Sequence, residues 1–110
     1  MNKDLESLHA TLIAYAISLA RAQENATTVE EVKNIGLEIS AMSHRATIVG
    51  QLLFKQQTKS ITAAVDEVNA ATGDLNKAIE EIDKFNDFIK TVTGFLKLVD
   101  QVIGIAKLAI

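Results

Sequence analysis

The sequence predicts an all-α protein, an antiparallel bundle of three long heptad-patterned helices within a single domain, 1–110. Large apolar residues recur at steps of three and four throughout the second half of the chain, 61–110. A helix with about 3.6 residues per turn places such positions on one stripe, whereas a strand requires alternation at every second residue, which is absent. Proline is also absent from the chain. No segment therefore contains the residue that interrupts helices most strongly.

The first helix is expected over residues 3–25. Its heptad stripe consists of Leu5, Leu8, Leu12, Tyr15, Leu19 and Ala22. A second apolar set widens this stripe and consists of Ala10, Ile13, Ala14, Ile17 and Ala20. Because so wide an apolar surface exceeds what one neighbour covers, we expect this helix to contact more than one other helix. The pattern ends between Glu24 and Thr28.

The second helix is expected over residues 28–56, antiparallel to the first because the loop between them is short. Thr28 and Glu31 have the spacing of a capping box, in which each side chain bonds a backbone amide of the other residue. Gly36 and Gly50 lie inside the helix, where glycine costs about 1 kcal/mol relative to alanine. We interpret them as positions where a neighbouring segment approaches closely.

The second turn is expected at residues 56–60. The apolar stripe of the second helix stops after Leu53 and restarts one residue late at Ile61, which makes Ser60 a candidate N-cap. A rival turn lies at 71–74, where a glycine could end one helix. We favour the first position because the apolar stripe runs through the second position without interruption.

The third helix is expected over residues 60–109, returning along the second. The apolar stripe slips once within it, after Ile82, and resumes at Phe85. At about 1.5 Å per residue the helix would be about 75 Å long, roughly twice the length of its predecessors. We therefore expect a bend or break near Gly94, where threonines and the glycine weaken the helix and which would create a fourth helix.

The charge distribution argues against a nucleic-acid-binding protein. The formal net charge is −3, and no basic face of the kind that contacts phosphates is evident. Residues 61–87 contain seven acidic side chains against two lysines, whereas 88–110 contain three lysines against one aspartate. Opposite charges attract, so the mildly basic tail could dock on the acidic segment of the same chain or of a second copy.

The tail, residues 88–110, is the strongest functional candidate in the sequence. Its polar residues fall on one narrow face and are Lys90, Thr93, Gly94, Lys97, Asp100, Gln101, Gly104 and Lys107. The remaining arc is apolar and too wide for one helix neighbour, so it predicts bundle core, an oligomer interface or a lipid-facing surface. Self-association, most simply as a two-fold dimer, is the expected arrangement. The predicted interface residues are Phe88, Val92, Phe95, Leu96, Val99 and Ile103.

Two function classes follow from this tail. The first is a non-enzymatic structural or interaction module that binds its own copy or a partner protein. The alternative is a membrane-active protein, pore-forming or bound to the membrane surface, that uses the amphipathic segment 88–110. Neither class requires a cofactor.

The chemistry of enzymes and metal sites finds little support in the sequence. Cysteine and a glycine-rich phosphate loop are absent. Glu6 and His9 have the spacing of half a di-metal motif, but the other histidine, His44, lacks a matching glutamate three residues earlier. Ser43 adjoins His44, yet sequence neighbours point to different faces of a helix. We expect no catalytic residue, no metal site and no enzyme activity.

The N-terminus does not resemble a secretory signal. Asp4 and Glu6 stand where a signal peptide has its basic region, and polar residues interrupt the apolar stretch that follows. No run approaches the ~18 apolar residues of a transmembrane helix. A cytoplasmic location is therefore expected.

Overall fold

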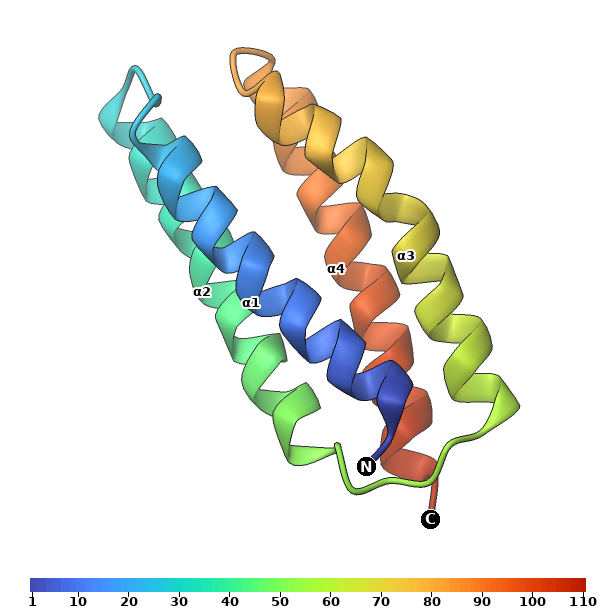
Figure 1. Cartoon of the computed structure of the whole chain (residues 1–110). Coiled ribbons are helices and arrows are strands. Elements are labelled where there is room, and N and C mark those ends of the chain that lie inside the picture. The colour runs from blue at the N-terminus through green and yellow to red at the C-terminus, as the bar shows by residue number, and fades with distance from the viewer.

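The structure, a computed structural model that describes residues 1–110, contains four helices and no strand. The helices are α1 (Lys3–Gln23), α2 (Val29–Gln51), α3 (Lys59–Glu80) and α4 (Phe85–Leu108). They form a bundle that measures 46 × 22 × 17 Å, with its long dimension along the helices (Figure 1). The predicted all-α fold is confirmed, as is the predicted antiparallel pairing of α1 with α2.

The bundle consists of two antiparallel hairpins, α1–α2 and α3–α4, lying side by side (Figure 1). The contacts between the hairpins join α1 to α3 and α2 to α4, and both of these pairs are parallel. The prediction that the third helix returns along the second is therefore wrong. The connecting segment, residues 52–58, crosses the end of the bundle diagonally and starts α3 beside α1 instead.

Hydrogen bonds hold this crossing segment against both ends of the chain. The backbone N–H of Asn2 donates to the Leu53 carbonyl at 2.9 Å, and the backbone N–H of Gln56 donates to the Ile110 carbonyl at 3.0 Å. The Lys55 ammonium donates to the Ala109 carbonyl at 2.6 Å, near the end of α4. Because these contacts require irregular backbone, α2 ends at Gln51, five residues before the predicted end at 56.

Side-chain caps start the first three helices. The Asn2 and Thr28 side chains accept from the amides three residues later, and the Thr28 cap confirms one half of the predicted capping box. The other half differs, because the Glu31 carboxylate accepts from the Thr27 amide at 3.1 Å rather than from Thr28. Thr58, and not Ser60, caps α3 by accepting from the Ile61 amide at 3.1 Å.

The second turn lies within 52–58, and α3 continues through the rival position at 71–74. The break in the long third helix lies at Glu81–Lys84, so the prediction of a break near Gly94 is wrong. The apolar stripe slips between Ile82 and Phe85, and a straight helix would turn its apolar side away from the core beyond this point. Folding back at the slip restores the packing of both halves.

The core runs the length of the bundle between the four helices. All six residues of the predicted α1 stripe are buried. Helices α1 and α4 lie on opposite corners of the bundle, and their side chains meet in the middle, where the Tyr15 and Phe95 rings pack edge to face with centroids 5.3 Å apart. The core thus lies between the two hairpins.

Candidate interaction surface

The six residues of the predicted interface all lie in the interior of the chain. Their exposed fractions are 7% or less, and they belong to one core cluster together with residues of the other three helices. The reason is the turn at Glu81–Lys84, which folds α4 back along α3. Most of the wide apolar arc of α4 is thereby covered by the chain's own helices, although Leu108 at its end is exposed. In this fold, none of the six predicted interface residues forms an exposed surface.

The outward side of α4 is the polar face that its sequence predicts. All eight residues of that face are exposed, from Lys90 to Lys107. Asp100 on this side accepts two hydrogen bonds from the Arg45 guanidinium of α2, at 2.7 and 3.0 Å. This bidentate ion pair links α2 to α4 at the surface of the bundle.

The outward side of α1 differs from that of α4 in its chemistry. We define the α1 outer face as the exposed residues opposite its core stripe, which are Lys3, Glu6, Ser7, Ala10, Ile13, Ala14, Ile17, Ala20, Arg21 and Glu24. Ile13 is 44% exposed and Ile17 51% exposed. Between Glu6 and Arg21 this helix contains no Asp, Glu, Lys or Arg. The α1 outer face is thus an apolar strip with charges only at its two ends.

The second apolar set of α1 is only partly covered by the rest of the chain. The helix does contact two neighbours, α2 and α3, as expected. It does so mainly through its leucine stripe, and Ala10, Ile13, Ala14, Ile17 and Ala20 remain exposed. Sequence reasoning missed this surface because both sets are apolar. The signal that identifies it is the charge-free interval of the helix between Glu6 and Arg21.

A groove of about 360 Å³ lies beside this face, between α1 and α2. Ile13, Ile17 and Ala20 line its α1 side, and Ser43, Ala46 and Thr47 line its α2 side. One end is closed by the His9 ring, which packs on Gly50 so tightly that an added Cβ would lie 3.1 Å from Nε2. The predicted close approach at Gly50 is therefore confirmed.

The other predicted close approach, at Gly36, is an ordinary contact. A Cβ placed there would lie 3.5 Å from Nε2 of Gln23, whose amide donates to the Val32 carbonyl at 2.9 Å. As for metal binding, nowhere in the chain do three His, Asp or Glu side chains converge. Glu6 points to solvent on the α1 outer face, while His9 lies against Gly50.

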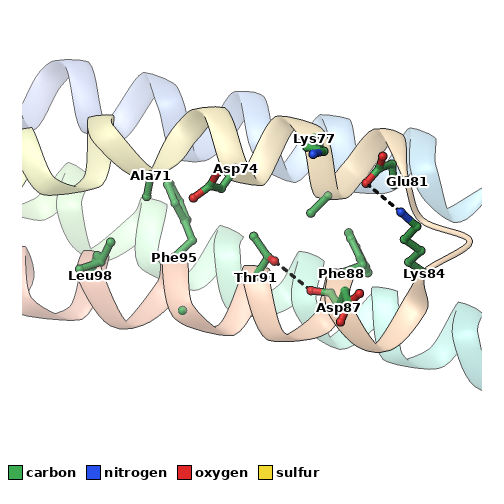
Figure 2. A pocket seen from close by; sticks show the side chains of 12 residues that line it. Ala71, Asp74, Lys77, Glu81, Lys84, Asp87, Phe88, Thr91, Phe95 and Leu98 are labelled. Carbon is green, nitrogen blue, oxygen red and sulfur yellow. Dashed lines mark hydrogen bonds and ion pairs between the residues drawn. The ribbon is translucent and has the colours of Figure 1, made fainter.

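A second groove, of about 590 Å³, lies between α3 and α4 on the opposite side of the bundle (Figure 2). Its rim is polar and its base includes Phe88 and Phe95. The charged rim residues alternate in sign and are Asp74, Lys77, Glu81, Lys84 and Asp87. Lys84 pairs with Glu81 at 3.7 Å, and the Thr91 hydroxyl donates to the backbone carbonyl of Asp87. Charges of opposite sign thus alternate along the rim, with three acids against two lysines.

One acidic side chain, Glu38, has a shifted pKa. Burial raises the pKa of the Glu38 carboxyl, and the nearby Arg45 charge offsets part of this increase. The buried Oε2 atom of Glu38 has no hydrogen-bond partner. Arg45 is instead engaged by Asp100 and by the Ala41 carbonyl. A raised pKa caused mainly by burial does not by itself indicate catalysis.

Comparisons of the chain with protein-family models, with curated proteins and with solved structures found no match. None of the four helices combines the length and the apolar character needed to cross a membrane.

Proposed function

We propose that the chain is a non-enzymatic helical interaction module that binds protein through the α1 outer face. The observation that carries this proposal is an exposed apolar strip on a bundle whose core is already complete. Isolated apolar side chains are common on protein surfaces, but a continuous strip with charges at its rim is typical of a protein contact. The strip belongs to a regular helix, so binding it requires no rearrangement of the fold.

The sequence led us to expect self-association through the tail, residues 88–110. We propose instead that any such contact is made by α1. Contact through Phe95 or Val99 would first have to expose the core, at a cost comparable to the free energy of unfolding. Contact through Ile13 and Ile17 instead removes apolar surface that is already exposed, at about 25 cal/mol per Å². The second route is favoured because it gains apolar burial without losing any.

Site-specific photo-crosslinking tests the proposal. A photo-crosslinking amino acid replaces Ile17, and in a matched control it replaces Thr93 on the polar face of α4. In cells that produce the protein, we expect a covalent protein adduct from position 17 and none from position 93. An absence of adduct at position 17, or equal adducts at both positions, would contradict the proposal.

The second candidate function is membrane activity of segment 88–110. It is supported by the packing, because contacts within each hairpin are more extensive than those between hairpins. Separating the hairpins would expose the apolar arc of α4 while keeping each pair intact. Flotation with anionic liposomes tests this candidate, with Lys90→Glu/Lys97→Glu/Lys107→Glu as the folded variant that loses attraction to headgroups. Wild-type protein that stays at the bottom of the gradient would exclude it.

A further inference from the structure

We propose that the occupant of the α1 outer face is the same face of a second copy, antiparallel about a two-fold axis. This inference rests on the proposed function and names the partner of the same surface. The axis passes between Ile13 and Ala14, at the centre of the charge-free interval. Each residue then lies at the same level along the helix axis as the partner's residue that is equally far from this midpoint in the other direction.

The charges at the two ends of the face support this arrangement. In chain order they are Lys3, Glu6, Arg21 and Glu24, and all four are exposed on the same side of the helix. An antiparallel copy places Lys3 opposite the Glu24 position and Glu6 opposite the Arg21 position, so both pairs attract. The two-fold axis repeats each pair, which gives four attractive pairs in the dimer. A parallel copy would place every charge opposite its own kind.

The apolar middle of the face combines large and small side chains. The same register places Ala10 opposite the partner's Ile17 near the middle of the face, and Ile13 beside its own symmetry mate. Ile17 thus meets an alanine, which lets a large side chain fit beside a small one. Facing helices with such contacts approach to about 8–10 Å between their axes.

The position of α1 in the bundle leaves room for this contact. Helices α2 and α3 flank α1, and α4 lies diagonally behind it, so α1 forms an outer corner (Figure 1). The groove between α1 and α2 borders the contact and offers apolar surface from Ile13 to Ala20 to the partner's side chains.

Disulfide trapping tests both the partner and the orientation. The chain contains no cysteine, so every disulfide reports on an introduced pair. We mix purified Ala10→Cys with Ile17→Cys under mild oxidation and identify the products by mass. The antiparallel register brings the two different cysteines together, whereas identical cysteines lie about 10 Å apart along the helix. A disulfide requires Cα atoms within about 7 Å.

The mixed disulfide is therefore expected at least ten-fold more abundantly than either product that joins identical cysteines. Predominance of identical pairs would overturn the antiparallel register, and no disulfide in any mixture would overturn the second copy as partner. Thr93→Cys, on the polar face of α4, serves as the control for random collision.

Charge reversal provides an independent test. Glu6→Arg or Arg21→Glu alone makes two pairs repulsive, so each is expected to weaken the dimer about ten-fold, as measured by analytical ultracentrifugation. The double variant Glu6→Arg/Arg21→Glu restores attraction and is expected to return to the wild-type dissociation constant. Lys97→Glu, outside the α1 outer face, is the matched control and should leave the dissociation constant of the dimer unchanged. Failure of the double variant to recover would overturn the register.

The outcomes separate this inference from the proposed function. An adduct from position 17 with the mass of a dimer agrees with the interaction module and with the second copy as its partner. An adduct with a different protein, together with no disulfide between purified copies, retains the interaction module and overturns the second copy. No adduct and no disulfide overturns both.

Discussion

Tyr15 joins three of the four helices through one side chain. Its hydroxyl donates to Oδ1 of Asn76 at 2.8 Å and lies 3.3 Å from the Thr72 carbonyl, both on α3. Its ring packs edge to face on Phe95 of α4. Burial disfavours the charged phenolate and raises the pKa of Tyr15 above its ordinary value.

Tyr15 is the only tyrosine in the chain, so its ionisation can be followed by absorbance without interference. We expect the folded protein to titrate above the value of about 10 that applies in urea. Because the folded state holds this proton more tightly, the associated stability is complete below that value and is lost as pH rises through the folded pKa. Equal midpoints in the folded and unfolded protein would contradict burial of the hydroxyl.

Residues whose role depends on near neighbours in sequence are the ones that could be predicted. Thr28 caps α2 through an amide three residues away, and spacing alone identifies it. Tyr15 is recognisable as core from the leucine stripe, but its partner Asn76 is not, because 61 residues separate them. The unpaired carboxyl of Glu38 is equally invisible in the sequence, since its burial depends on how the finished helices pack.

Among the helices, α4 shows how packing outweighs local propensity. Gly94 and its flanking threonines lower helix propensity, yet Val92 and Phe95 on either side are buried and keep the helix continuous. The Thr91 hydroxyl bonds the carbonyl four residues earlier, which is compatible with an uninterrupted helix. The break occurs instead where the apolar stripe changes phase. Periodicity was thus a better guide to the turn than composition.

Alanine substitution at two glycines tests this description of α4. A Cβ at Gly94 would meet no atom within 4 Å, so we expect Gly94→Ala to stabilise the fold by up to about 1 kcal/mol. Gly50→Ala is the matched control, because there the new Cβ would press on the His9 ring and a smaller gain or a loss is expected. Urea denaturation measures the free energy of unfolding of both variants. Destabilisation by Gly94→Ala would indicate a hinge at this position.

For the whole molecule, the sequence predicted the class of fold but placed the third helix along the second, which is wrong. The short loop after α1 permits only an antiparallel neighbour, whereas the segment 52–58 is long enough to reach either side of the first hairpin. Its hydrogen bonds to Asn2 and Ile110 select the diagonal path, and these contacts exist only after both chain ends have docked. The tail was assigned to an interface for the same reason, because an apolar arc does not reveal which helices will cover it.

One pair of variants distinguishes the core from the proposed contact surface. Val99 is fully buried, so Val99→Asp places a carboxylate in an apolar interior at a cost of several kcal/mol, a large part of a typical folding free energy. We expect this variant to lose its cooperative thermal transition. Ile17 is half exposed, and Ile17→Glu is expected to shift stability by no more than about 0.5 kcal/mol.

Circular dichroism melts measure both variants at a protein concentration low enough for the wild type to be monomeric. Under these conditions a lost dimer contact cannot be mistaken for a weakened core. Light scattering at higher concentration should then show the wild type as a dimer and Ile17→Glu as a folded monomer. If Val99→Asp instead melts like the wild type but fails to dimerise, α4 and not α1 forms the contact between copies, and the apolar tail of the chain is exposed in solution.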